Sequence, residues 1–228
     1  VPVYAGTGCI STKETIEQSK MAEAAGADVL SIITPSFAAA SQEELYAHYK
    51  AVAEAVDMPI VLYNIPARTG NALAPATVGR LAQIENIIGA KDSSGNFANI
   101  LNYINAGNKK ENGKFYTLSG NDQLIIWTLL AGGTGGIAGC ANVYPHTMAS
   151  IYNLFMEGKI EEAKAANASI QSFRDCFKYG NPNTIVKTAV RLLGYEVGPC
   201  RAPFNQVPEE GIKALKKVLA ENKAKGMH

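Results

Sequence analysis

The sequence predicts an α/β fold: a (β/α)8 TIM barrel that lacks its first two βα units within these 228 residues and carries a C-terminal helical extension. Short apolar runs alternate with helical stretches, and strand starts recur about every 20 to 30 residues, the length of one βα unit. The first of six such runs begins at residue 2 or 3, whereas a closed parallel barrel needs eight strands. We therefore expect barrel units three to eight over residues 1–144, and the last barrel helix with the extension over residues 145–228.

The expected strands are short runs rich in branched and aromatic residues, bounded by turn formers. They cover residues 2–8, 29–33, 60–63, 87–91, 116–119 and 136–139. Gly26 ends the helix before the second strand, and Thr34-Pro35 breaks that strand, so both boundaries have a local cause. The segment from Asn64 to Gly70 is rich in turn formers and is predicted to be a loop.

Helix starts carry capping signals. Ser11 and Ser41 each precede a glutamate by three residues, the spacing of a capping box, and Pro75 suits the first turn of a helix. Further helices are expected over residues 96–106 and 122–130, and after residue 145 with starts at Pro182 and Pro208.

Composition excludes several classes of function. A hydrophobic content of 47% with 18% charged residues supports a folded core, and a net charge of +1 offers no basic surface for nucleic acid. Residues 123–145 are uncharged and long enough to span a bilayer, but five glycines between 132 and 139 disfavour such a helix, so no membrane contact is expected.

The cysteines and histidines show no metal-binding pattern, and we expect neither a metal nor a cofactor. The four cysteines contain no C-x-x-C pair and the three histidines lack metal-binding spacing; these residues are Cys9, Cys140, Cys176 and Cys200, and His48, His146 and His228. We expect reduced thiols and a cytoplasmic protein.

The candidate chemistry lies just past the apolar runs, because the carboxyl ends of the strands form the active face of a parallel barrel. Lys91 ends one run, and a dehydrated lysine can attack a carbonyl. Tyr63 could relay protons and Arg68 could pair with a carboxylate, so the set suggests a keto acid. The same side chains also fit an ordinary solvated rim. Asp92 is expected as the electrostatic neighbour of Lys91 or as a first-turn acid of the next helix.

The glycine-rich stretch has two interpretations. Residues 132–139 could cradle a phosphate at a late barrel strand, or they could allow close packing of a strand against a helix.

Six segments resemble, in this order, the dihydrodipicolinate synthase / N-acetylneuraminate lyase family. They are Ala5-Gly-Thr-Gly8, Thr34-Pro35, Tyr63-Asn-Ile-Pro-Ala-Arg-Thr-Gly70, Gly89-Ala-Lys-Asp-Ser-Ser-Gly95, Ser119-Gly-Asn-Asp122 and Gly133-Thr-Gly-Gly-Ile137. The third and fourth at this separation are the specific ones.

The resemblance implies a barrel enzyme, usually a tetramer, in which Lys91 forms a Schiff base with pyruvate. Tyr63 is similar to the family's proton-transfer tyrosine, and Gly120 and Ile137 to pocket residues near the lysine. Arg68 resembles the arginine that holds the carboxylate of aspartate semialdehyde in the synthase branch, and it favours that branch over the sialate lyases.

Two departures from the family pattern concern the pyruvate site and the proton relay. The family's Gly-Thr-Thr-Gly-Glu loop, which binds the pyruvate carboxylate, is absent from these residues, and Phe37 stands where the synthases have a second relay tyrosine.

The expected function is therefore that of a Schiff-base lyase of lysine biosynthesis, condensing pyruvate with aspartate semialdehyde as a homo-oligomer, a tetramer or a dimer. The alternatives are an N-acetylneuraminate lyase-like or 2-keto-3-deoxy sugar acid aldolase, and an inactive binding or assembly subunit.

Overall fold

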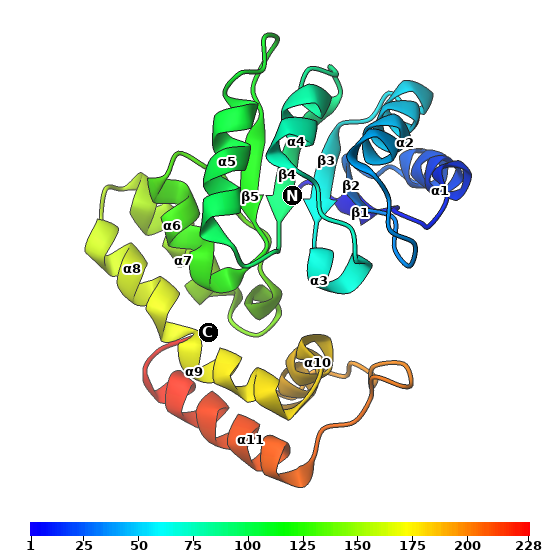
Figure 1. Cartoon of the computed structure of the whole chain (residues 1–228). Coiled ribbons are helices and arrows are strands. Elements are labelled where there is room, and N and C mark those ends of the chain that lie inside the picture. The colour runs from blue at the N-terminus through cyan, green and yellow to red at the C-terminus, as the bar shows by residue number, and fades with distance from the viewer. The chain divides into compact units, whose positions relative to one another are not determined.

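The computed structural model describes residues 1–228 and contains one sheet of parallel strands joined by helices (Figure 1). The strands lie in sequence order, each pairing with the next, as in part of a barrel wall. They are β1 (Tyr4–Gly6), β2 (Val29–Ile33), β3 (Ile60–Asn64), β4 (Ile87–Asp92), β5 (Tyr116–Ser119) and β6 (Gly135–Gly136). The predicted α/β class and the six predicted strands are confirmed, and the sheet forms a half-barrel.

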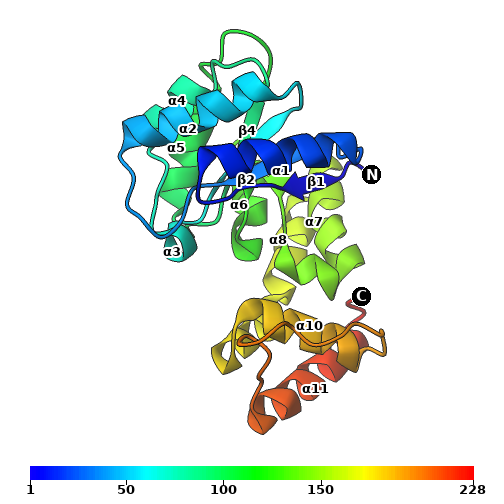
Figure 2. The same cartoon turned by 90° about the vertical axis from the view of Figure 1, so that its right-hand side faces the viewer.

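Helices between the strands cover one face of the sheet (Figures 1 and 2). They are α1 (Thr12–Ala24), α2 (Gln42–Ala55), α3 (Pro66–Thr69), α4 (Pro75–Leu81), α5 (Phe97–Gly107), the 3-10 turn η1 (Asp122–Leu124) and α6 (Ile125–Leu130). Helix α1 packs on α2, α2 on α4 and α4 on α5, so the longer helices follow the strand order.

Helix caps largely follow the sequence signals. Ser41 and Glu44 form the complete capping box, with the Glu44 carboxylate 2.7 Å from the Ser41 backbone nitrogen. Ser11 accepts a hydrogen bond from the Glu14 backbone N–H, but the Glu14 carboxylate bonds the Ser11 hydroxyl instead of its backbone. Pro75 begins α4, as predicted.

Two local predictions were wrong. The Asn64–Gly70 segment contains the single helical turn α3, because Pro66 presets the first helical residue and Gly70, at φ 79°, closes the turn through its N–H to the Pro66 carbonyl. Strand β6 is only Gly135–Gly136 instead of residues 136–139, since it has one neighbour, β5, and the chain then turns into η2 (Gly139–Asn142).

The core lies between the sheet and its helices. Alternate strand residues face the helices and are fully buried, among them Leu30, Ile32, Ile60, Leu62 and Ala90. Their partners come chiefly from α2, α4 and α5, including Leu45, Tyr49, Val52, Val78, Leu81 and Tyr103. Since successive strand residues point to opposite faces, Ser31, Tyr63 and Lys91 belong to the other, open face.

The chain divides into two compact units, Val1–Ile137 and Ala138–His228, and the second is helical. Its helices are α7 (Pro145–Met156), α8 (Ile160–Ser169), α9 (Gln171–Arg174), the 3-10 turn η3 (Asp175–Tyr179), α10 (Pro182–Leu192) and α11 (Glu209–Ala224). Pro182 begins α10 and Pro208 is the N-cap of α11, as predicted. Inside this unit, the rings of Tyr144 and Phe173 meet edge to face.

None of the helices combines the length and apolar character needed to cross a bilayer.

Candidate active site

Lys91 and Tyr63 lie side by side on the open face of the sheet. Their Cα atoms are register partners on β4 and β3, and the Lys91 Nζ atom is 3.8 Å from the centroid of the Tyr63 ring. Neither the amine nor the phenol hydroxyl makes a hydrogen bond or an ion pair, and both residues are half-buried. A nucleophile and a proton carrier are therefore adjacent, and both are available to a substrate.

Asp92 does not neighbour the Lys91 amine, so the expectation of a direct electrostatic pair was wrong. The two side chains alternate to opposite faces of β4, and Asp92 is fully buried. Its carboxylate accepts hydrogen bonds from Asn64 Nδ2 at 2.6 Å, Ser94 Oγ at 2.6 Å and Asn99 Nδ2 at 3.1 Å. These three donors, which the sequence interpretation missed, lock the ends of β3 and β4 behind Tyr63 and Lys91.

The same network continues into the loop before α4. Asn64 accepts a hydrogen bond from the Leu73 backbone N–H at 3.0 Å, and the Tyr103 hydroxyl donates to the Leu73 carbonyl at 2.5 Å. Burial raises the pKa of Tyr103 well above its usual value, and the nearby Asp92 carboxylate raises it further. Tyr103 thus remains a protonated donor and holds this loop against the strand ends.

Gly120 lies against Lys91, after β5. A Cβ atom at this position would come within 1.8 Å of Ser93 Oγ and 2.8 Å of Lys91 Cε, so only glycine fits beside these side chains. The Gly120 N–H also bonds the Asp92 carbonyl at 2.7 Å. This close approach sets one wall of the space around the lysine.

Ile137 and Arg68 lie just past the carboxyl ends of their strands. Ile137 follows β6 and extends its ladder, donating from its N–H to the Ser119 carbonyl at 2.8 Å. Arg68 is in α3, directly after β3, where its exposed guanidinium has no carboxylate partner. The structure therefore brings Lys91, Tyr63 and Gly120 together, and places Arg68 and Ile137 at the same end of the sheet.

The loop that carries Arg68 is tied to the loop after β2. Thr34 Oγ1 donates to Thr69 Oγ1 at 2.8 Å, and Asn71 Nδ2 donates to the carbonyls of Pro35 and Ala38. Phe37 projects from this second loop with 97% of its surface exposed and φ at 81°, a backbone conformation uncommon outside glycine.

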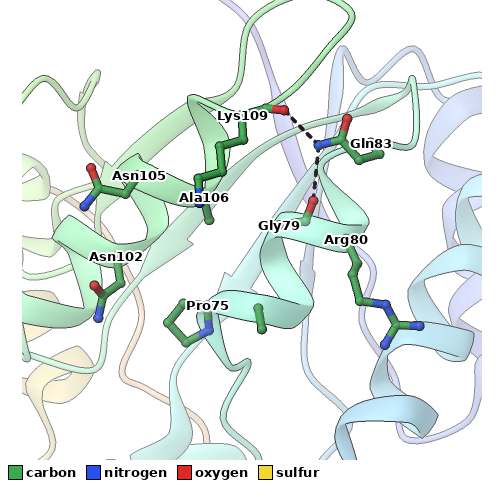
Figure 3. A pocket seen from close by; sticks show the side chains of 9 residues that line it. Pro75, Gly79, Arg80, Gln83, Asn102, Asn105, Ala106 and Lys109 are labelled. Atoms are coloured by element: carbon green, nitrogen blue, oxygen red, sulfur yellow. Dashed lines mark hydrogen bonds between the residues drawn. The ribbon is translucent and has the colours of Figure 1, made fainter.

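Polar groups also line a groove of about 520 Å³ between α4 and α5, on the helix-covered face (Figure 3). There, Gln83 donates to the carbonyls of Gly79 and Lys109. Arg80 is paired bidentately with Glu43 and stacks 3.9 Å above the Tyr46 ring. Gln83 and Arg80 thus already have partners in the free protein, whereas the Lys91 amine and the Tyr63 hydroxyl have none, so the open face around Lys91 is the better candidate site.

Comparisons with known proteins agree with this fold and identify the family. The family model described as the dihydrodipicolinate synthetase family matches residues 1–222. The 4-hydroxy-tetrahydrodipicolinate synthase of Archaeoglobus fulgidus is 39% identical over 219 residues, which is 96% of this chain and 74% of that protein. The enzyme of the same name from Methanothrix thermoacetophila is 39% identical over 222 residues, 97% of this chain and 74% of the relative.

Solved structures of proteins with the same family name have the same fold. The dihydrodipicolinate synthase of Thermotoga maritima superposes with a TM-score of 0.93 at 30% identity, covering 98% of this chain and 76% of that one. The synthase of Acinetobacter baumannii, solved with pyruvate, has a TM-score of 0.90 at 35% identity, covering 100% and 76%.

Proposed function

The chain belongs to the dihydrodipicolinate synthetase family, and from this premise we propose that it condenses pyruvate with an aldehyde through a Schiff base on Lys91. We propose aspartate semialdehyde as the aldehyde, which makes the protein a 4-hydroxy-tetrahydrodipicolinate synthase and a lyase of lysine and diaminopimelate biosynthesis. The observation that carries this proposal is the unpaired Lys91 amine beside the unpaired Tyr63 phenol and against Gly120.

In this mechanism the Lys91 amine attacks the ketone carbon of pyruvate. One proton moves from nitrogen to the former ketone oxygen, and a second, taken up from solvent, lets that oxygen leave as water while a protonated C=N bond forms. The Tyr63 hydroxyl carries these protons, and the centroid of its ring lies 3.8 Å from the Lys91 Nζ atom. Loss of a methyl proton then gives the enamine, whose carbon attacks the aldehyde.

Arg68 is assigned to the carboxylate of the aldehyde substrate. Its guanidinium is exposed, has no internal carboxylate partner and follows the strand that carries Tyr63. A planar guanidinium binds a carboxylate through two parallel hydrogen bonds, which gives both affinity and orientation. Ile137 and Gly120 are assigned to the walls of the pyruvate pocket.

Reductive trapping tests the Schiff base. Incubation with pyruvate and borohydride should add a reduced pyruvyl group to Lys91, located by peptide mass spectrometry. Lys109→Ala changes an exposed lysine far from the open face and should trap as the native protein does. Trapping that persists in Lys91→Ala would reject the mechanism.

A substrate panel separates the three candidate functions. Turnover of aspartate semialdehyde that falls at least about 10-fold in Arg68→Ala supports the synthase, because a charge-assisted pair contributes roughly 1.5–3 kcal/mol. Arg80→Ala, which removes an exposed arginine already paired with Glu43, is the matched control. Cleavage of an N-acetylneuraminate or 2-keto-3-deoxy sugar acid would support the aldolase, and pyruvate binding without turnover the inactive subunit.

We further propose that the sheet corresponds to units three to eight of a (β/α)8 barrel, residues 1–144, with the last barrel helix and the helical extension over residues 145–228. Strands β1 and β6 each have a neighbour on one side only, so two more βα units placed between them would close the ring. A chimera with two such units ahead of Val1 should bind pyruvate more tightly than the chain alone, measured by calorimetry.

The remaining proposals concern assembly and location. A homo-oligomer, tetramer or dimer, is supported by Phe37, whose backbone is strained at a positive φ and whose almost fully exposed aromatic side chain suits burial against another copy. We place the enzyme in the cytoplasm, where its four cysteines, which form no disulfide, stay reduced. The amine and phenol supply the chemistry without a metal or cofactor.

A further inference from the structure

Ser93 carries a hydroxyl that the fold does not use. Its Oγ atom is buried and makes no hydrogen bond, although its backbone N–H bonds the Asn64 carbonyl at 2.8 Å. Two nearby serines behave differently: Ser94 donates to Asp92 at 2.6 Å, and Ser119 donates to the Asn121 carbonyl at 2.8 Å. A buried hydroxyl without a hydrogen-bond partner loses its hydration without compensation, which costs stability. Such a group is explained if a bound substrate supplies the missing partner.

The position of this hydroxyl is fixed by Gly120. A Cβ atom on Gly120 would lie 1.8 Å from Ser93 Oγ and 2.8 Å from Lys91 Cε. Because both distances start from the same point, the separation of Ser93 Oγ and Lys91 Cε cannot exceed their sum. Ser93 follows Lys91 by two residues, on the same side of the chain. The amine nitrogen is one bond beyond Cε, so the hydroxyl can reach atoms attached to that nitrogen.

The hydroxyl is not bonded to the amine in the free protein. Lys91 Nζ instead lies over the Tyr63 ring, 3.8 Å from its centroid. Gly120 therefore packs against two side chains whose polar ends have no partner, the Ser93 hydroxyl and the Lys91 amine. A keto acid joined to the amine would bring a new oxygen atom next to the hydroxyl.

We propose that Ser93 is a further catalytic residue, whose hydroxyl hydrogen-bonds the former ketone oxygen of the keto acid while Lys91 forms its Schiff base. This inference rests on the function proposed above. As the C–N bond forms, the carbonyl electron pair moves to oxygen, and Ser93 donates a hydrogen bond to the developing charge. The oxygen then leaves as water with the two protons described for the mechanism, and Ser93 keeps its own.

An unpaired hydroxyl makes this role separable from a structural one. Replacing Ser93 with alanine removes a polar atom that has no partner, so the variant should melt at the same temperature as the native protein or higher. A serine that held the fold together would show the opposite response. Melting temperature and adduct formation thus report on two different roles.

The test measures the rate of borohydride-trapped pyruvyl adduct on Lys91 in the native protein, Ser93→Ala and Ser93→Thr. Ser93→Ala should form the adduct about 10 to 100 times more slowly at saturating pyruvate, as expected for loss of one donor to a developing oxyanion. The pyruvate concentration for half-saturation should change little, because the hydrogen bond strengthens in the transition state. Ser93→Thr, which keeps the hydroxyl, should restore most of the rate.

The matched control is Ser19→Ala. Ser19 is fully buried in α1 and its hydroxyl is bonded to Thr7 Oγ1 at 2.9 Å, so its loss should lower the melting temperature and leave the adduct rate unchanged. A native adduct rate in Ser93→Ala would overturn the role of Ser93 alone. Failure of the native protein to form any adduct would overturn the proposed function, and this inference with it.

Discussion

The two faces of strand β4 differ in what their polar groups do. Asp92, on the helix-covered face, is fully buried and accepts three side-chain hydrogen bonds. Lys91, one residue earlier on the open face, makes none and rests on the Tyr63 ring. One side of the strand satisfies every polar atom, and the other leaves its reactive groups without partners.

This difference shows how one strand separates stability from reactivity. Side chains alternate along a strand, so adjacent residues can serve the core and the site independently. The fully buried Leu62 and Ala90 belong to the core, whereas their neighbours Tyr63 and Lys91 are half-buried and unpaired. We expect substitutions on the open face to affect adduct formation, and substitutions on the helix-covered face to affect the free energy of unfolding.

The largest expected effect is that of Lys91→Gln. The variant loses the only amine beside Tyr63, so aldol turnover should fall by at least about 1,000-fold, roughly 4 kcal/mol of lost transition-state stabilisation. Its melting temperature should stay close to that of the native protein, because the amine makes no hydrogen bond or ion pair. Thermal unfolding and turnover measured on the same sample check both expectations. A strongly lowered melting temperature would contradict the view that the open face serves reactivity and the helix-covered face serves stability.

Leu62→Ala should be the reverse case. Leu62 is fully buried among helix residues, and leucine-to-alanine changes in cores cost about 2–5 kcal/mol. Chemical denaturation should show this loss, while the adduct rate per folded molecule stays near the native value. Leu101→Ala, on the outer surface of α5, is the control and should be almost neutral.

Asp92→Ala should combine a smaller loss of stability with a functional defect. Removing the carboxylate leaves Asn64, Ser94 and Asn99 without their shared acceptor, which should cost about 1–3 kcal/mol. Because the network fixes the strand ends behind Lys91, adduct formation should also slow down. Equal slowing in Leu62→Ala would show that any loss of stability disturbs the site, contrary to our view.

The smallest expected effect is a pH dependence of stability from His48. Its Nε2 atom is buried without a partner, and burial lowers the pKa of this histidine below its usual value of about 6.5. The folded state thus binds fewer protons than the unfolded state just below that pH, and stability should fall as the pH drops from about 7 to 5. The free energy of unfolding, measured by urea denaturation at several pH values in this range, should change less with pH in His48→Gln than in the native protein. His146→Gln, which changes an exposed histidine, is the control and should behave as the native protein does.

Local signals explain how much could be predicted from the sequence. Branched and aromatic runs predicted strands β2 to β5, and Ser41, Pro75 and Pro182 marked helix starts, because these features act within a few residues. The turn α3 escaped prediction because one helical turn has too few residues to show a periodicity. The length of β6 depends on its neighbour β5, and no local pattern encodes that pairing.

The site was less accessible to sequence reasoning, because contacts between distant residues define it. Strand ends and the family resemblance led to Lys91, Tyr63, Arg68, Gly120 and Ile137, whose roles remain proposals. The acceptor role of Asp92 depends on which face the helices cover, and the unpaired hydroxyl of Ser93 becomes visible only once Gly120 lies against it.

The hydrogen bonds made by Thr34 and Asn71 have a consequence for the entropy of substrate binding. They join the loop after β2 to the loop that carries Arg68 in the unliganded protein, so the ordering of these backbones is already part of folding. A carboxylate arriving at Arg68 then restricts little more than one side chain. Association at this position should therefore proceed with a small entropy penalty, unlike that of an enzyme whose loops close only around their ligand.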